Sequence, residues 1–300
     1  MPSRRSTHWK AYLALFCGLL ILGFSAIFTR LANAPGTVVS FYRMGIGTLV
    51  LAIPFASRWR VGRPLPRRGK TLAMAAGIFF ALDLASWASG ITLAGATIPT
   101  LLGNTAPLWV GLGAWLLFKE DLGAKFWLGL GLALAGAITV LGLDLSNGLS
   151  LNTGALLGLL AAVFYGSYLL VAQRSRDVLD TLSFFWIAAL SSSITLLFLC
   201  LVLRTPLTGY PTSTYLNFLG LGVLVQAGGW MSINYAQGFL PASLVAPTLL
   251  AQPLLTAILA GPLLGETFST GEWLGGAAVL LGIIIVHRSR HQAHLAGQGI

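Results

Sequence analysis

The chain of 300 residues has the composition of a membrane protein, which excludes an ordinary soluble domain. Hydrophobic residues make up 56% of it and charged residues only 9%, whereas a soluble domain carries about 25% charged residues. Its formal net charge is +10, yet stretches of about twenty residues repeatedly carry no charge, although a soluble protein needs charge dispersed over its surface.

Ten apolar segments follow one another along the chain, each close to the roughly 20 residues that a helix needs to cross a bilayer. They cover residues 11–31, 36–56, 71–92, 97–118, 125–143, 153–172, 181–203, 214–236, 241–264 and 272–287. The connections are short and turn-like, and no segment shows sustained period-2 alternation, which favours helices over a β-barrel. We therefore expect an all-α membrane protein with ten transmembrane helices.

The first apolar segment is expected to remain a span. Ala32-Asn33-Ala34 resembles a signal-peptidase site, so a cleavable signal peptide is the alternative. However, the apolar run is longer than the core of a signal peptide, Arg30 interrupts it and Pro35 follows it.

Basic residues fall mainly at one set of span ends. Of 18 Lys and Arg residues, 15 lie on the side that holds both termini: Arg4, Arg5, Lys10, Arg58, Arg60, Arg63, Arg67, Arg68, Lys70, Lys119, Lys125, Arg174, Arg176, Arg288 and Arg290. Because cytoplasmic loops are enriched in Lys and Arg, we expect a multi-pass protein of the bacterial inner (plasma) membrane with both termini in the cytoplasm. The net charge then reflects topology and contact with anionic lipids, and no nucleic-acid partner is expected.

The two halves of the chain resemble each other at an offset of 146 residues. The stretch PLWVGLGAWLLFKEDLGAKFWLGLGLALAG, from Pro107, aligns with PLLTAILAGPLLGETFSTGEWLGGAAVLLG, from Pro253. The matches include Pro107 with Pro253, Glu120 with Glu266, Trp127 with Trp273, Gly129 with Gly275 and Gly136 with Gly282. A duplication explains these identities. We assign residues 1–145 to a first five-helix repeat, 146–288 to a second and 289–300 to a cytoplasmic tail.

Five spans per repeat is an odd number, so the second repeat must cross the membrane in the opposite sense. Glu120 is then expected on the basic side, and Glu266, within the Lys- and Arg-free GETFSTGE, on the other. Inverted repeats are a design of secondary transporters, because the halves can exchange conformations and open alternately to each side. We expect two inverted five-helix repeats around a central cavity.

The ten spans in two copies, each with a Pro-to-Glu stretch before its last helix, resemble the drug/metabolite transporter superfamily and its EamA-type exporters. The resemblance covers roughly residues 10–288. Within the superfamily the chain is similar to bacterial aromatic amino acid exporters, through LDLASWASG in span 3 and Asn-Thr-Ala-Pro-Leu in span 4. This resemblance implies a cavity lined mainly by spans 1, 3, 4, 6, 8 and 9, with spans 5 and 10 at the periphery.

Pro107 and Pro253 occupy equivalent spans, and each removes a helix hydrogen bond from its turn. Matched helix interruptions in two repeats point to a binding cavity, although two packing kinks are the alternative. The polar residues Asn104, Thr105 and Gln252 lie beside these prolines. We expect them to bind substrate, and the alternative is that they join helices by hydrogen bonds.

Two further spans carry polar and aromatic residues on one helical face. Span 8 reads QAGGWMSINYAQ, with Gln226, Trp230 and Asn234 at a spacing of four. Span 3 offers Phe79, Asp83, Ser86 and Trp87. Tyr165 and Trp186 are expected to add aromatic walls, although any single aromatic residue also fits a packing or interfacial role. Such a combination suits a small molecule with an apolar body and a polar head.

Asp83 lies in an otherwise uncharged run, where an ionised carboxylate facing lipid would cost about 2.5 to 3.5 kcal/mol. It is therefore expected to face the protein interior. Three interpretations compete: a structural acid, for which Arg43 of span 2 is a candidate partner, a contact for a substrate's ammonium group, and a proton-coupling site.

No cofactor or metal is expected, because His8, His287, His291 and His294 lie near the termini, and Cys17 and Cys200 form no motif. The prediction is a secondary transporter that exports small amphipathic metabolites, aromatic or other neutral amino acids, with facilitated transport preferred over proton coupling. A channel-like pore and an intramembrane enzyme using Asp83 are the alternatives. The expected partners are the small-molecule substrate and membrane lipids, and the expected state is a monomer or a weak homo-oligomer.

Overall fold

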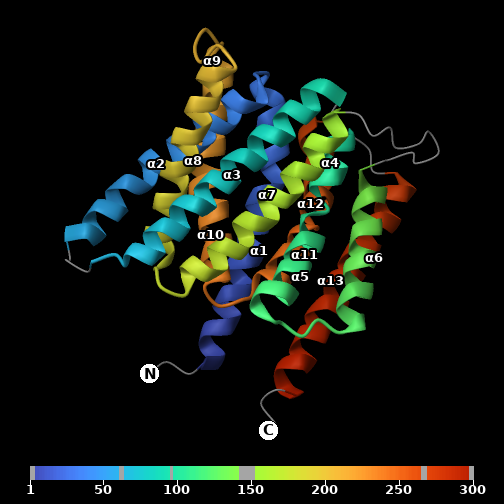
Figure 1. Ribbon diagram of the computed structural model, residues 1–300. Coiled ribbons are helices and arrows are strands. Elements are labelled where there is room, and N and C mark those ends of the chain that lie inside the picture. The colour runs from blue at the N-terminus through green and yellow to red at the C-terminus, as the bar shows by residue number, and fades with distance from the viewer. Residues whose placement is uncertain (1–3, 61–63, 95–96, 142–152, 265–268, 297–300) are drawn as a thin grey trace.

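The computed structural model describes residues 4–60, 64–94, 97–141, 153–264 and 269–296, and every regular element in these ranges is a helix. The elements are α1 (Arg4–Ala32), α2 (Gly36–Arg60), α3 (Arg67–Ala94), α4 (Thr97–Gly103), α5 (Ala106–Phe118), α6 (Ala124–Val140), α7 (Thr153–Arg176), α8 (Thr181–Val202), α9 (Thr212–Gly220), the π-helical η2 (Leu221–Trp230), α10 (Met231–Gln237), α11 (Ala242–Leu249), α12 (Gln252–Leu264) and α13 (Thr270–Ala296). They form a single bundle (Figure 1).

These elements make up the ten expected spans. Nine stretches of the described chain are long and apolar enough to cross a membrane. The tenth span is α6, an apolar helix of 17 residues, which is about 25 Å long at a rise of 1.5 Å per residue. Two spans each consist of two short helices, α4 with α5 and α11 with α12, while α9, η2 and α10 follow one another as a third composite span. The prediction of an all-α membrane protein with ten transmembrane helices is confirmed.

The last helices of the two halves, α6 and α13, pack side by side along a seam of small residues (Figure 1). A Cβ added to Gly129 would lie 2.9 Å from the Gly282 carbonyl oxygen, and one added to Gly136 would lie 2.5 Å from the Gly275 carbonyl oxygen. Such an approach is open only to residues with little or no side chain. The small residues of α6 therefore form a helix-packing surface.

The direction of this seam shows that the halves are inverted. Gly129 meets Gly282 and Gly136 meets Gly275, so α6 and α13 run in opposite directions. The offset of 146 makes Gly129 equivalent to Gly275 and Gly136 to Gly282. Each glycine therefore contacts the counterpart of the other, as in a two-fold symmetric interface.

Other pairs of helices follow the same exchange. At the offset of 146, α7 is the counterpart of α1, and α9–η2–α10 is the counterpart of α3. The packing of α3 on α7 therefore corresponds to the packing of η2 and α10 on α1, and the packing of α5 on α7 corresponds to that of α12 on α1. The α2 helix packs on its equivalent, α8, again antiparallel, because Thr48 meets Trp186 while Arg58 meets Asp180. The predicted repeat boundary at 145/146 and the predicted position of Glu266 fall outside the described residues.

The start of α1 and the end of α13 lie at one end of the bundle, which we call the terminal end; the opposite end is the distal end (Figure 1). The end of α2 and the start of α3, together with the connections from α5 to α6, α7 to α8 and α10 to α11, also lie at the terminal end (Figure 1). Arg58, Lys119, Arg174 and Arg176 lie at or next to the helix ends found there.

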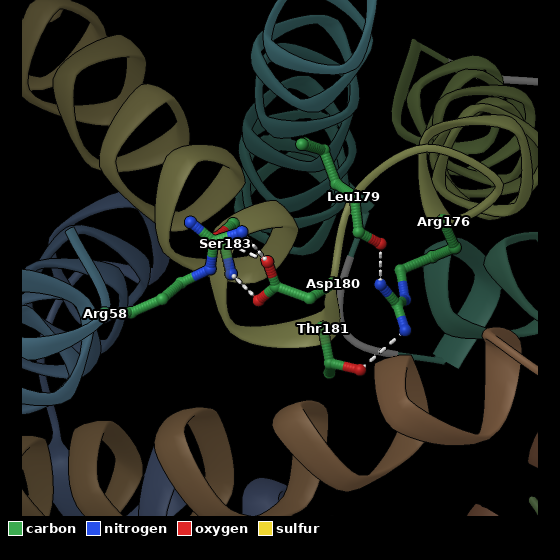
Figure 2. A network of polar contacts seen from close by, with 6 residues as sticks. All are labelled: Arg58, Arg176, Leu179, Asp180, Thr181 and Ser183. Carbon is green, nitrogen blue, oxygen red and sulfur yellow. Dashed lines mark hydrogen bonds and ion pairs between the residues drawn. The ribbon is translucent and has the colours of Figure 1, made fainter. Parts of the chain in front are cut away.

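The terminal end is tied together by two polar networks. In the first, Arg58 of α2 contacts Asp180 at 2.5 Å, and Asp180 caps α8 by accepting from the Ser183 backbone N–H at 3.0 Å (Figure 2). Nearby, Arg176 donates to the Leu179 carbonyl and to the Thr181 hydroxyl (Figure 2). This network joins α2, α7 and α8.

The second network joins the two halves near the end of α13. Arg290 contacts Glu120 at 2.6 Å and donates to the Asp121 carbonyl at 3.1 Å. Ser243, at the start of α11, donates to the same Glu120 carboxylate at 2.5 Å. Because these groups lie on segments far apart in the chain, the contacts hold the terminal ends of several helices together.

A leucine at Gly136 should destabilise the protein, because its Cβ would lie within 2.6 Å of backbone atoms of Gly275 and Val279. Overpacking of this kind costs about 1 to 3 kcal/mol. Thermal unfolding in detergent should show a lower Tm for Gly136→Leu than for Gly131→Leu, since a Cβ at Gly131 meets nothing within 4 Å. Equal stability of the two variants would contradict the close seam.

Removal of the Asp180 carboxylate should also destabilise the terminal end. Partial burial opposes its charge, but hydrogen bonds from Ser183 and contact with Arg58 outweigh burial and hold the pKa of Asp180 below its usual value. Loss of a helix N-cap costs about 1 kcal/mol. The carboxylate's contribution is present above the unfolded-state pKa of about 3.9 and is lost as pH falls through the lower folded-state pKa.

We therefore expect Asp180→Ala to have a lower Tm than the parent at pH 7, with the gap shrinking in strong acid. The exposed neighbour Asp177 provides the control, and Asp177→Ala should stay within about 0.5 kcal/mol of the parent. The same loss in both variants would show that the cap and the ion pair contribute nothing specific.

Candidate functional site

A central cavity of about 450 Å³ lies between the two halves. It is lined by residues from both repeats: Leu22, Ser25, Ala26, Thr29, Gly36, Val39, Ser40, Arg43, Phe80, Asp83, Leu84, Trp87, Thr100, Gly103, Asn104, Val140, Leu141, Tyr165, Trp230, Gln252, Pro253, Thr256 and Ala257. Thr29 and Gly36 lie at the distal ends of α1 and α2, and Ala26 is solvent-exposed. The cavity therefore reaches from the middle of the bundle to its distal end.

Interruptions of two equivalent helices border this cavity. The α4 helix ends at Gly103 and α5 begins at Ala106, while α11 ends at Leu249 and α12 begins at Gln252. At an offset of 146 these two breaks coincide. Each lies just before a Pro-Leu pair that both repeats share, Pro107-Leu108 and Pro253-Leu254. A broken helix leaves backbone carbonyls unpaired, which a membrane protein tolerates where they face protein or a water-filled cavity.

The polar side chains near the breaks are partly held by the backbone. Asn104 Nδ2 donates to the Thr100 carbonyl at 2.9 Å, and Gln252 Nε2 makes a long contact of 3.4 Å with the Leu22 carbonyl. One turn after Gln252, Thr256 donates to the Gly23 carbonyl at 2.9 Å. These bonds use one N–H of each amide, and the side-chain carbonyls of Asn104 and Gln252 accept no hydrogen bond from the described residues.

Aromatic side chains close the cavity toward the terminal end. The Trp230 ring lies 4.8 Å from Phe80, 5.9 Å from Tyr165 and 5.7 Å from Tyr168, measured between centroids. Trp230 is only 4% exposed. Behind this aromatic floor the Tyr168 hydroxyl donates to Asn234 Oδ1 at 3.0 Å. The floor separates the cavity from the polar networks of the terminal end.

Arg43 and Asp83 are the two charged residues among the lining residues of the described chain. Arg43 donates from Nε to Gln226 Oε1 at 2.9 Å and from Nη1 to Ser25 at 3.3 Å. Asp83 lies within electrostatic reach of Arg43. A charged group in a membrane interior must be paired or face water, which makes this cavity the candidate functional site.

Two buried donors beside the cavity have no hydrogen-bond partner in the described part of the chain. They are Gln226 Nε2, next to Arg43, and the indole Nε1 of Trp230. Unpaired buried donors cost free energy, about 1 to 3 kcal/mol each. Both atoms are buried beneath the cavity surface, so they are not exposed to a ligand in this state.

The structure gathers seven of the predicted residues around the cavity: Asp83, Trp87, Asn104, Tyr165, Trp230, Gln252 and Pro253. The others lie outside its lining. Gln226 is connected to the cavity by its hydrogen bond with Arg43, and Asn234 lies behind the aromatic floor, where it bonds to Tyr168. Phe79 stacks on Phe164, so its neighbour Phe80 faces the cavity in its place. Ser86, Thr105 and Pro107 do not line it, and Thr105 donates to the Leu102 carbonyl.

The prediction that Trp186 forms a wall of the site does not fit the structure. Its indole donates to the Thr48 carbonyl at 3.1 Å and its ring stacks on Phe55 at 4.1 Å. It belongs to the α2–α8 contact, since α8 packs against α2 and α3 and contributes none of the described residues that line the cavity.

The spacing argument for span 8 also needs correction. Gln226 and Trp230 lie in the π-helical segment η2, whose turns are wider than those of an α-helix, while Asn234 lies in α10. The three side chains are all buried, but they sit at successive depths, and only Trp230 lines the cavity.

Span 2 is the main contributor that the resemblance did not imply. Gly36, Val39, Ser40 and Arg43 of α2 line the cavity, as do Val140 and Leu141 at the distal end of α6. The α2 helix comes close to η2 because Gly47 faces Gln226; an added Cβ would lie 2.6 Å from Gln226 Cγ. For spans 1 and 9 the sequence did carry a signal of the lining face. Ser25 and Thr29 in span 1, like Gln252 and Thr256 in span 9, are polar residues at a spacing of four, and all of them line the cavity.

Comparison with known proteins identifies the duplicated unit. Residues 9–142 and 152–288 each match the EamA-like transporter family. An uncharacterized transporter of Archaeoglobus fulgidus is 25% identical over 276 residues, covering 92% of this chain and 95% of that protein. An uncharacterized transporter of Synechocystis is 27% identical over 241 residues, covering 78% and 72%.

A solved structure described as "Crystal structure of protein" shares the fold, with a TM-score of 0.76 and 20% identity over 95% of this chain and 98% of that one. The two matched copies, the inverted helices and the membrane spans agree. The protein is a multi-pass membrane transporter rather than an enzyme, and the chain belongs to the EamA-like transporter family, within the drug/metabolite transporter superfamily.

Proposed function

We propose that the protein exports small amphipathic metabolites, in particular aromatic or other neutral amino acids, across the bacterial inner membrane by alternating access. The observation that carries the proposal is the cavity between inverted halves, which reaches the distal end and is closed by aromatic residues toward the terminal end. A site that opens to one side at a time is what alternating access requires.

The chemistry of the cavity fits this class of substrate. Its volume of about 450 Å³ lies within the roughly 300 to 1,000 Å³ of small-molecule sites. Trp87, Tyr165 and Trp230 offer apolar and aromatic surface, while Asn104 and Gln252 offer polar groups. Nucleotide-sugars and lipid phosphates fit less well, because Arg43 is the single cation among the described lining residues.

The basic residues at the terminal end support an orientation with both termini in the cytoplasm. In that orientation the described state faces outward. Inward opening would then require the terminal-end contacts of Arg58 with Asp180 and of Arg290 with Glu120 to separate while the distal ends close. The paired breaks at 104–105 and 250–251 are the places where α4–α5 and α11–α12 can bend during this change.

Truncation of the aromatic floor should impair transport. Trp230→Ala removes the ring that packs on Phe80 and Tyr165, and we expect exchange of labelled L-phenylalanine in proteoliposomes to fall about tenfold, equivalent to about 1.4 kcal/mol. Asn234→Ala should also reduce it, because Tyr168 loses its partner. The control is Trp115→Ala, since Trp115 is 56% exposed on the outer surface of α5. Normal exchange by both Trp230→Ala and Asn234→Ala would remove span 8 from the site.

A panel of amino acids tested by counterflow, with and without a pH gradient, examines substrate and coupling together. We expect exchange of aromatic and other neutral amino acids that does not require the gradient, because Asp83 is the single acidic residue among the described lining residues. Conductance without exchange would favour the channel-like alternative. Transport that requires the gradient would favour proton coupling through Asp83.

A further inference from the structure

The two charged residues of the cavity are close enough to interact but are not joined to each other. Arg43 and Asp83 both line the cavity and interact electrostatically. In the described part of the chain, however, neither a salt bridge nor a hydrogen bond links them. An ion pair that serves only the fold gains most from direct, bidentate contact, so their separation calls for another explanation.

Arg43 is held away from Asp83 by other side chains. Its Nε donates to Gln226 Oε1 at 2.9 Å and its Nη1 donates to Ser25 at 3.3 Å. The residue is 8% exposed. These bonds occupy part of the guanidinium, and Nη2 makes no hydrogen bond to the described residues. One edge of a fixed planar donor group is thus left for an acceptor in the cavity.

Asp83 is the complementary group. It receives no hydrogen bond from the described residues, although it lies in the middle of α3, about 16 Å from the distal end of that helix at 1.5 Å per residue. An ionised carboxylate at such a depth needs a cation or several donors. Its environment therefore lacks a positively charged group in direct contact.

With Asp83 ionised, the cavity presents one positive and one negative charge that are not in direct contact with each other. A ligand with only a negative group would leave Asp83 without a counter-ion. A ligand with only a positive group would leave Arg43 without one. A ligand that places a negative group at Arg43 and a positive group at Asp83 compensates both residues and brings no net charge into the membrane.

We propose that Arg43 binds the carboxylate and Asp83 the ammonium group of an α-amino acid zwitterion. This inference rests on the proposed function and assigns its recognition. The side chain of the substrate then lies against the aromatic floor of Phe80, Tyr165 and Trp230.

The test removes one charge at a time from both the substrate and the protein. L-phenylalanine, 3-phenylpropanoate (no ammonium group) and phenethylamine (no carboxylate) compete with labelled L-phenylalanine for exchange in proteoliposomes. The parent protein should bind L-phenylalanine at least about tenfold more tightly than either analogue, equivalent to about 1.4 kcal/mol.

Each variant should lose one preference and keep the other. Arg43→Gln should lose the preference for L-phenylalanine over phenethylamine but keep that over 3-phenylpropanoate, and Asp83→Asn should show the reverse. Arg204→Gln and Asp177→Asn are charge-matched controls at exposed positions and should keep both preferences. If the neutral variants do not fold, Arg43→Lys and Asp83→Glu replace them; these should keep both preferences while binding all three compounds more weakly.

The outcomes separate this inference from the function on which it rests. If the parent exchanges L-phenylalanine but Arg43→Gln and Asp83→Asn weaken all three compounds equally, or if they keep both preferences, the charge assignment is wrong and the proposed function stands. The same holds if Arg43→Lys and Asp83→Glu, used as replacements, lose both preferences. If the parent exchanges no amino acid at all, the proposed function fails and the assignment fails with it.

Discussion

The close antiparallel packing of equivalent helices is the constraint on which the rest of the structure depends. Gly129 and Gly136 of α6 meet Gly282 and Gly275 of α13 at distances that admit no side chain. Because α6 and α13 are copies of one another and run in opposite directions, the halves must be inverted. Inversion in turn places α1 to α5 opposite their counterparts, and the cavity forms where the two sets face each other.

Inversion also explains why the two ends of the bundle can differ although the halves are alike. At the terminal end, Arg58, Asp180, Glu120 and Arg290 join helices from both halves, while the cavity reaches the distal end. Two similar halves can adopt the converse arrangement by exchanging conformations. The polar contacts are partly exposed, so each contributes modestly and can be broken without a large cost in free energy.

Much of the architecture could be predicted from the sequence, because apolar length, basic loops and the Pro, Glu and Trp matches at one offset are local or periodic signals. The residues of the site were harder to predict. Asp83, Trp87 and Trp230 stood out as polar or aromatic residues within apolar spans, and they line the cavity. Trp186 stood out equally but packs on Phe55, and Arg43 faces the cavity only because of the α2–η2 contact at Gly47. A sequence pattern shows which residues share a helix face but not which neighbouring helix that face meets.

The most direct test of a cavity that opens to one end at a time is the labelling of a cysteine at Ala26, an exposed residue of the cavity lining. The variant Ala26→Cys is made in a chain with Cys17 and Cys200 replaced by alanine, and Asp121→Cys marks the terminal side. A membrane-impermeant maleimide should react at position 26 from the distal side without substrate, and from the terminal side only while L-phenylalanine is exchanged. Equal reaction from both sides without substrate would contradict alternating access, and reaction from the terminal side alone would contradict the opening of the cavity at the distal end.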